Sequence, residues 1–470
     1  MPPTPATDPT AAPPAPGRVL STLNADGSRR SIRPRPIKGA WWRKRRTVAY
    51  GLMVVFFVIP YLRMGGKPLI LLDIPRREFT VFGTTFLSTE TIFFQLLFLA
   101  AVVGLFLVTA LLGRVWCGWG CPQTVYMEFL FRPIERWFEG GWRGSLALDA
   151  SRRPALGRIA KHAVYVLLAM FLAHTFLGYF VRVSDLARWV TGPPAEHPTA
   201  FLVMLTTTGL IYFDFAWFRE QTCLVACPYG RLQSVLLDRR SLIVAYDSQR
   251  GEPRGHVDAP GPLGDCVDCG MCVQTCPTGI DIRDGLQMEC IHCTQCADAC
   301  DRVMTKLHRP IGLVGFSSRD RLERRAGTWL RPRVLLYPAA LVVTLGLFAV
   351  LMARRADSEV TLLRGTGVPF TVETDGSVAN QIRVRVTNKG AAARRYTIAW
   401  ADSTPGTLIA PVNPLVVDAG QMKETSVFAV LPPGRLHGGA RDVLLRLTDD
   451  TGRVTDVPYR LVGPEPEEAR

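Results

Sequence analysis

The chain has 470 residues, of which 48% are hydrophobic, and its net charge is +15 at pH 7. This length predicts two or three domains, and the large apolar share makes membrane spans the first feature to seek. So basic a chain suggests nucleic acid as a partner. Lys and Arg gather beside apolar segments instead, and no nucleic-acid-binding motif occurs, so we expect no nucleic-acid partner.

The N-terminal residues 1–46 are rich in Pro, Ala and Arg and show little apolar periodicity. This composition predicts a mostly disordered basic tail in the cytoplasm. A basic run at 43–46 precedes the first apolar stretch. No small-residue cleavage site clearly follows that stretch, which is therefore predicted to span the membrane and not to be a signal peptide.

Five apolar segments are long enough, or nearly so, to cross a bilayer core of about 30 Å. The fourth is the weakest, because three threonines and Asp214 interrupt it. Four of them form a predicted membrane domain over 47–218, with spans at about 47–64, 91–112, 162–181 and 200–218, and the fifth span covers 334–352.

Loop charge predicts the orientation of these spans. The tail carries ten Lys or Arg and loop 113–161 carries eight, whereas loop 182–199 carries only Arg182 and Arg188. Loop 219–333 is strongly basic again. The positive-inside rule then places the N-terminus and both basic loops in the cytoplasm. Five spans place the C-terminus on the opposite side of the membrane.

The C-terminal region 358–465 has a different pattern. Segments such as 381–387 and 442–448 alternate apolar and polar residues, and Gly, Pro, Asn and Asp separate them. This pattern is typical of a small antiparallel sandwich whose sheets each have one solvated face. The region contains no cysteine, so it must rely on its apolar core, for which about 100 residues suffice.

Eight of the twelve cysteines form two runs with C-x2-C-x2-C-x3-C spacing in the predicted cytoplasmic domain 219–333. This is the spacing of bacterial ferredoxins with two [4Fe–4S] clusters, in which the last cysteine of each run ligates the other cluster. The alternative is a pair of zinc sites, which seldom use three x2-spaced cysteines followed by x3. The predicted ligand sets are Cys266, Cys269, Cys272 and Cys300 for one cluster, and Cys290, Cys293, Cys296 and Cys276 for the other.

The second run has Asp301 where a proline usually follows its last cysteine. That proline shapes the turn and supplies no ligand, so the local backbone is in question and the cluster is not. Clusters of this kind carry one electron at a time. The domain is therefore predicted to conduct electrons.

The other four cysteines lie in two C-x-x-x-C-P motifs, each directly after an apolar segment on the same predicted side. The repetition indicates a duplicated two-span unit. Thiolates are soft donors that favour Cu(I), so Cys117, Cys121, Cys223 and Cys227 could form one copper site. Another redox group, a regulatory disulfide, or four buried cysteines without a ligand role are the alternatives.

Ionisable side chains in the predicted spans are further candidates, since such residues at membrane depth are often functional. His174 lies within the third span and His162 near its cytoplasmic end. About 18 Å of helix separates them, so they cannot share one metal. They could ligate haem, line a quinone site, or simply bond to a neighbouring helix, and Asp214 could pair with Arg219.

Taken in order, these parts resemble the cytochrome c oxidase accessory protein family called CcoG, FixG or RdxA. The resemblance rests on the motifs at 117–122 and 223–228, on the stretch from His174 to Leu177, and on the eight-cysteine domain, and it covers nearly the whole chain. It implies a multi-domain protein of the bacterial inner membrane with about five transmembrane helices, a two-cluster ferredoxin domain and a periplasmic immunoglobulin-like sandwich.

The resemblance also implies a function, namely reduction of Cu(II) to Cu(I) for assembly of cbb3-type cytochrome c oxidase. The C-x-x-x-C-P thiols would then be the catalytic copper ligands, with His174 as a weaker candidate. Expected partners are oxidase assembly factors, a copper chaperone or exporter, and an unknown electron donor. Two alternatives remain open: a membrane electron-transfer subunit of the quinol-dehydrogenase type, and a non-enzymatic scaffold for oxidase assembly.

Overall fold

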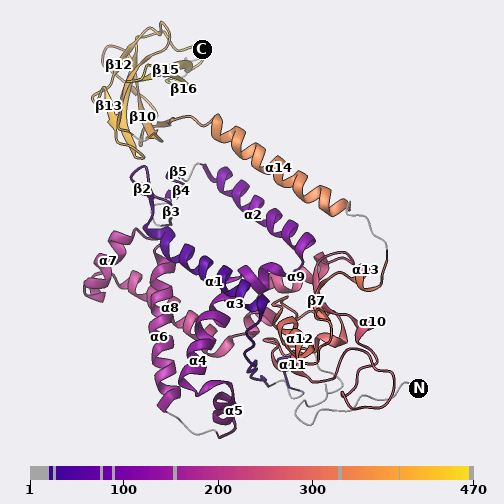
Figure 1. Ribbon diagram of the computed structural model, residues 1–470. Helices are drawn as coiled ribbons and strands as arrows, with labels where there is room; N and C mark the ends of the chain where they lie inside the picture. Colours follow the sequence, from indigo (N-terminus) through magenta and orange to yellow (C-terminus); the bar gives the residue numbers. More distant parts are fainter. Residues whose placement is uncertain are drawn as a thin grey trace. The chain divides into compact units, whose positions relative to one another are not determined.

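The computed structural model describes residues 21–24, 28–74, 78–86, 90–151, 156–325, 331–390 and 392–464. The chain divides into two compact units, 1–348 and 349–470 (Figure 1). The first unit contains the apolar helices and the cysteine-rich domain, and the second contains the C-terminal strands.

Four helices in the described part of the chain are long and apolar enough to cross a membrane. They coincide with the second to fifth predicted spans, with ends shifted by up to six residues. They are α2 (Thr91–Leu112), α6 (Leu156–Leu177), α8 (Pro198–Phe213) with its π-helical continuation η6 (Asp214–Phe218), and α14 (Pro332–Ala353).

The first predicted span is not among these four helices. Helix α1 (Ala40–Val58) begins seven residues before the predicted span, and its first half contains the basic run at 43–46. A 3-10 turn, η1 (Ile59–Tyr61), follows it. The apolar part of this segment is therefore short, because the basic run occupies the first half of α1 and the helix ends at Val58, just before Pro60.

The predicted disorder of residues 1–46 is wrong for the described residues just before α1, which pack on the cysteine-rich domain. The backbone N–H of Arg35 donates to the carbonyl oxygen of Gln274 at 2.8 Å. The N–H groups of Trp41 and Trp42 donate to the carboxylate of Asp298, at 3.0 and 2.7 Å. Asp298 thus caps α1 from another domain, where its negative charge suits the positive end of the helix. Residues 1–20 and 25–27 lie outside the described residues.

The rest of the first unit connects these helices. A three-stranded antiparallel sheet and a two-stranded hairpin follow α1, and short helices follow α2 and α6. The strands are β1 (Arg63–Met64), β2 (Lys67–Pro68), β3 (Ile70–Asp73), β4 (Glu78–Val81) and β5 (Thr84–Phe86); the helices are α3 (Pro122–Tyr126), η4 (Met127–Phe131), α4 (Arg132–Phe138), α5 (Gly141–Ser151), α7 (Val183–Thr191), η5 (Pro194–Glu196) and α9 (Pro228–Leu236).

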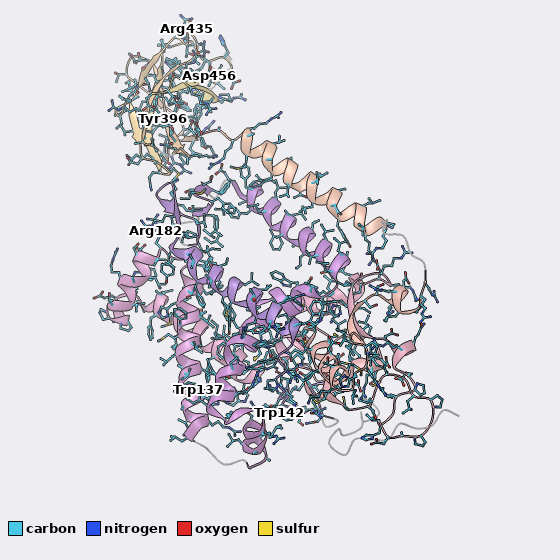
Figure 2. All side chains as sticks on the ribbon, viewed as in Figure 1. Trp137, Trp142, Arg182, Tyr396, Arg435 and Asp456 are labelled. Carbon is cyan, nitrogen blue, oxygen red and sulfur yellow. The ribbon has the colours of Figure 1, made fainter. Side chains whose placement is uncertain are left out.

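One apolar core joins α1 to the helices on either side. Phe131 and Phe215 stack with ring centroids 4.2 Å apart, and Tyr165 packs edge-on against Phe131. Met53 of α1 and Leu172 of α6 belong to the same buried cluster. At the periphery, Trp142 of α5 (labelled in Figure 2) donates its indole N–H to the carbonyl oxygen of Arg33. The core therefore includes side chains of both α1 and α6.

The cysteine-rich domain is small and mostly irregular. Strands β6 (Ile243–Tyr246) and β7 (Val314–Ser317) pair antiparallel, although 67 residues separate them. Helix α12 (Gln295–Lys306) lies beside β7 (Figure 1). It continues through Cys300 and Asp301, so the missing proline lengthens a helix and leaves the cysteine in place. The remaining short elements are α10 (Ser248–Gly251), α11 (Met271–Gln274), η8 (Ile282–Asp284) and α13 (Arg319–Leu322).

The second unit is the predicted antiparallel sandwich. Strand β10 alternates strictly, with Ile382, Val384 and Val386 buried and the arginines between them less so. Tyr396, labelled in Figure 2, lies in the same core. One sheet runs β12-β14-β10-β8 with β9 beside β10, and the other runs β13-β11-β15-β16. The strands are β8 (Ser358–Arg364), β9 (Thr371–Val372), β10 (Val378–Asn388), β11 (Arg394–Trp400), β12 (Thr407–Ile409), β13 (Leu415–Val417), β14 (Met422–Leu431), β15 (Ala440–Asp449) and β16 (Val454–Val462).

Candidate iron–sulfur and thiol sites

The eight ferredoxin-type cysteines line two neighbouring cavities. We call them the outer cavity, of about 370 Å³, and the inner cavity, of about 330 Å³. Cys272 reaches both, so the two cavities adjoin. The outer cavity is lined by Cys266, Cys269, Cys272 and Cys300, and the inner cavity by Cys276, Cys290, Cys293 and Cys296.

This division matches the crossed ligand sets predicted from the spacing, since the last cysteine of each run lies at the other run's cavity. The cavities suit a multi-atom cluster better than a single ion. The residues therefore fit two [4Fe–4S] clusters.

The two cavities differ in exposure. Cys269 at the outer cavity is exposed, whereas Cys290, Cys293 and Cys296 at the inner cavity are each at most 9% exposed. Burial raises the pKa of the Cys290 thiol to about 12 and that of Cys293 to about 11. Without a metal these thiols hold their protons, and binding a positively charged iron–sulfur core would release them.

The two C-x-x-x-C-P motifs have the same local structure. Each forms a single π-helical turn, and we call them the first turn, η3 (Trp116–Gly120), and the second turn, η7 (Thr222–Ala226). The second cysteine of each motif ends its turn in an extended conformation, and the following proline begins the next helix. Proline suits that position because it has no N–H to leave unpaired.

The duplication extends upstream of the cysteines. Gly113 and Arg219 each lie four residues before the first cysteine of their motif, and both have positive φ, at 63° and 52°. Positive φ is easy for glycine and costs free energy at arginine. Arg219 is held by Glu135, which accepts two hydrogen bonds from its guanidinium, at 2.9 and 3.3 Å.

The fold brings the four thiols of these turns near one another. Burial and the neighbouring Cys121 thiol raise the pKa of Cys117 to about 12, and Cys227 acts in the same direction. The pKa of Cys223 is also raised by burial and by Cys121 and Cys117. The Cys117 thiol donates to the Gln233 side-chain oxygen at 3.2 Å, which joins the first turn to the helix after the second turn. The four do not form a ready three-ligand site for one ion among the described residues.

The first turn lies directly against the inner cavity. A Cβ added at Gly118 would lie 2.5 Å from the carbonyl oxygen of Ile291, between Cys290 and Cys293. A Cβ at Gly113 would lie 3.0 Å from the ring of His292. The backbone N–H of Arg114 donates to His292 Nδ1 at 3.0 Å. Only glycine permits so close an approach of the two loops, which places the first turn beside the inner cluster site.

Of the two histidines of the third span, His174 lies apart from this site. Arg45 of α1 donates to the carbonyl oxygen of Gly118 in the first turn, whereas Phe56, about 17 Å further along α1, accepts from Tyr179, just past α6. His174 therefore lies at the opposite end of the helices from the cysteines, with its Nδ1 2.7 Å from the carbonyl oxygen of Met170. The ring of His162 is 3.0 Å from the Tyr212 hydroxyl.

The expected side-chain pair of Asp214 and Arg219 is wrong. Asp214 instead accepts from Thr222 and from Gln123, the latter at 3.2 Å, and so links the second turn to α3 after the first turn. Arg219 belongs to a buried network of charges that sequence reasoning missed. Its other members include Arg29, Arg33, Arg132, Glu135, Glu139, Lys161 and Glu220.

A third cavity, of about 390 Å³, lies between this network and the second turn, and Arg45, Glu220, Cys223 and Ile291 are among its lining residues. The contacts that Arg45, Arg114 and His292 make at this site could not be predicted from the sequence. Arg45 looked like one of four basic residues that orient a span, and Arg114 like a loop charge.

Comparison with protein families gives three matches. Residues 218–319 match a 4Fe-4S dicluster domain, and residues 348–464 match the Ig-like fold at the C-terminus of FixG. Residues 94–143, which contain α2 and the first turn, match a 4Fe-4S binding domain. The ferredoxin domain and the immunoglobulin-like sandwich expected from the sequence are both confirmed.

Three curated proteins resemble most of the chain. Nitrogen fixation protein FixG of Rhizobium meliloti is 32% identical over 91% of this chain and 92% of its own length. For proteins RdxB and RdxA of Cereibacter sphaeroides, the identities are 34% and 36%, covering 92% and 79% of this chain and 95% and 82% of theirs. A crystal structure of a FixG-related protein from Vibrio parahaemolyticus, 15% identical, covers 23% of this chain and 98% of its own, with a TM-score of 0.21. The chain belongs to the FixG/RdxA/RdxB family of membrane-associated iron–sulfur electron-transport proteins.

Proposed function

We propose that this protein reduces Cu(II) to Cu(I) at the bacterial inner membrane, in support of the assembly of cbb3-type cytochrome c oxidase. The observation that carries the proposal is the close approach of Gly118, between Cys117 and Cys121, to Ile291 at the inner cavity. It puts a pair of soft metal ligands beside a site suited to an electron carrier.

The residues divide this work between them. Two [4Fe–4S] clusters, when bound by the eight cysteines of the cavities, supply electrons one at a time. Exposed Cys269 marks the side on which an electron donor would dock. The buried cysteines of the inner cavity keep water away from the end that faces the first turn.

The thiols at 117, 121, 223 and 227 bind the substrate. Copper arrives as Cu(II), takes up one electron and becomes Cu(I), and each thiol that binds it gives up a proton to water. Thiolate sulfur is a soft ligand that favours Cu(I) over Cu(II), so the site stabilises the product of the reduction. Because the thiols are not arranged as a closed cage, Cu(I) can leave toward a copper chaperone, an exporter or an oxidase assembly factor.

The membrane orientation forms part of the proposal. The residues before α1 contact the cysteine-rich domain through Arg35 and Trp41, so both lie on one side of the membrane. An even number of crossings must then separate them. Helices α2, α6 and α8 give three, so α1 supplies the fourth despite its short apolar part. Basic loops place this side in the cytoplasm, and α14 carries the sandwich to the periplasm.

The test is a Cu(II)-reduction assay on the full chain, purified without oxygen and reduced beforehand, with a Cu(I) indicator. Cys117→Ser should remove most of the activity and leave the iron content and the visible iron–sulfur absorption unchanged. Thr206→Ala, at an exposed position of α8, is the control and should behave as wild type. Reduction of Cu(II) at the wild-type rate by Cys117→Ser and by Cys223→Ser would exclude the thiols as the site.

A second candidate is a membrane electron-transfer subunit that passes electrons from quinol to another reductase. The match of residues 94–143 to a 4Fe-4S binding domain favours it, since that segment has only Cys117 and Cys121 and the second turn would have to complete a cluster there. Metal analysis separates the two: about eight iron atoms per chain fit two clusters, and about twelve fit a third cluster held by the two turns.

A further inference from the structure

Two buried arginines lie between the first turn and the inner cavity. Arg45 is 1% exposed and Arg114 is 4% exposed. Arg45 donates its Nε–H to the carbonyl oxygen of Gly118 at 3.0 Å. Arg114 donates from Nη1 to the carbonyl oxygens of Cys290, at 3.2 Å, and of Met288. The Arg45 guanidinium thus contacts the backbone of the first turn. The Arg114 guanidinium contacts the backbone of Cys290, a predicted ligand of the inner cluster.

The partners of these two arginines are neutral. All the acceptors named above are backbone carbonyls, and within the described residues no ion pair joins Arg45 or Arg114 to a carboxylate. Glu128 is close enough to feel the charge of Arg45, but its carboxylate is bonded to Arg132 at 2.7 Å. Glu289 is close enough to feel the charge of Arg114, but it forms no ion pair with it among the described residues and accepts from the Ser21 N–H at 3.4 Å. Arg45 Nη1 and Arg114 Nε are buried without a hydrogen-bond partner. Both positive charges are therefore available to act on the inner cavity.

The outer cavity has no such buried and unpaired arginine among its described neighbours. Arg283, the lining arginine, is paired with Asp281 at 2.6 Å and with Asp268. Arg250 is paired with Asp265 at 2.5 Å. Arg309 donates only to the backbone carbonyl oxygens of Gly264 and Asp265, but it is partly exposed, so water screens its charge more than that of Arg45 or Arg114.

This contrast matters for electron affinity. A cluster held by four thiolates is anionic and gains another negative charge on reduction, so net charge, hydrogen bonds and solvent exposure set its potential. Burial alone would make the inner cluster the harder one to reduce, because water stabilises the more highly charged state. An unpaired positive charge a few ångströms away acts in the opposite sense, and more strongly where the dielectric constant is low.

We propose that Arg45 and Arg114 raise the reduction potential of the inner cluster above that of the outer cluster. One electron then passes from the outer cluster, which is oxidised, to the inner cluster, which is reduced, and no bond or proton need change. Electrons are thereby directed from exposed Cys269 toward the first turn. The inference rests on the cluster sites of the proposed function and needs no copper.

The experiment is a redox titration followed by electron paramagnetic resonance on the anaerobically purified, cluster-loaded full chain. We expect two midpoint potentials in wild type. Arg45→Gln and Arg114→Gln should each lower the higher one, so that the ratio of reduced to oxidised inner cluster at a fixed potential falls about tenfold, or about 59 mV for a one-electron couple. The lower midpoint should stay in place. Cys269→Ser, which changes only an outer ligand, identifies the outer signal.

Matched variants separate charge from structure. Arg302→Gln removes an exposed arginine of α12 that also bonds only to a backbone carbonyl, that of Lys38, and should shift neither midpoint. Arg45→Lys keeps the charge and should retain most of the higher potential. Unchanged midpoints in both Gln variants would overturn the inference, as would a shift confined to the outer signal. Loss of iron from both Gln variants would also overturn it, since the arginines would then hold the fold and not the potential. Absence of any cluster signal in wild type would instead refute the proposed function.

Discussion

The two groups of cysteines in this protein are held in different ways. The eight ferredoxin-type cysteines surround two cavities of about 330 and 370 Å³, and several are fully buried. The four cysteines of the C-x-x-x-C-P motifs lie on single π-helical turns at the ends of membrane helices, and all four are half-buried. One group encloses a volume, and the other presents thiols at a junction between segments.

This difference distinguishes a site suited to a permanently bound cofactor from a site suited to a substrate that binds and leaves. Cavities that exclude water suit clusters that stay bound through many turnovers. Thiols on a turn, without a closed set of ligands, suit a metal that must arrive and leave. The two groups are joined at Gly118, where the backbone of one nearly touches the backbone of the other.

The largest effect is expected at the inner cavity. Cys293→Ser removes a buried ligand of the inner cluster, so about half of the iron should be lost. Cu(II) reduction should then fall to background, because the outer site has no contact with the first turn. Iron per chain and the copper assay are measured on the same preparation. Full Cu(II)-reduction activity with half the iron would contradict the proposal that electrons reach the first turn through the inner cluster.

The junction itself should give the next largest effect. Gly118→Ala places a Cβ 2.5 Å from the Ile291 carbonyl oxygen, and both partners are backbone, so the loops must separate. We expect Cu(II) reduction to fall about tenfold or more, since misplacement by about 1 Å is costly for a reaction that depends on position, while both clusters remain. Gly104→Ala, in α2 with open space around its Cβ, is the matched control. Equal rates in the two variants would show that the contact is not used.

A smaller effect, on stability and not on chemistry, is expected in the buried charge network. Glu135 is 4% exposed, and Arg219 and Arg33 hold its pKa well below the usual range against the opposing effect of burial. Glu135→Gln removes one carboxylate partner from each of these buried cations and should cost roughly 3 kcal/mol, seen as a lower apparent Tm in detergent.

The same carboxylate predicts a pH dependence. Because the folded pKa is lowered, the ionised form stabilises the fold above the unfolded value of about 4.5, and this contribution is lost as the pH falls below it. The Tm difference between wild type and Glu135→Gln should therefore shrink on acidification from pH 6 to about pH 4. A difference that grows on acidification would contradict the assigned sign.

Features with a local signature could be predicted from the sequence. The cysteine spacing predicted which cysteines line each cavity, because three cysteines of each set lie within seven residues of one another. The alternation of apolar and polar residues in β10 predicted the sandwich, because buried and less buried side chains alternate with the two-residue period of a strand. The repeated C-x-x-x-C-P motif indicated a duplication, and the two turns have the same local structure.

Features that depend on distant partners could not be predicted. The start of α1 is fixed by Asp298, some 257 residues away, so the helix begins before the basic run and the first span was placed too late. Arg219 was paired with Asp214 because they are neighbours in sequence, whereas the fold turns its side chain to Glu135. In the sequence, Arg45 is one of four consecutive basic residues that indicate membrane orientation. Only its hydrogen bond to the Gly118 carbonyl oxygen in the fold indicates that it also acts at the first turn.

The most direct test mixes the reduced protein rapidly with Cu(II) in the absence of oxygen and follows the iron–sulfur absorption and a Cu(I) indicator together. The account predicts that the clusters are oxidised as Cu(I) appears, with one electron lost per copper reduced. In the double variant Cys117→Ser/Cys223→Ser, the clusters should stay reduced over the same time. Cluster oxidation at the wild-type rate in that variant would contradict the claim that electrons leave the protein through the thiols of the two turns.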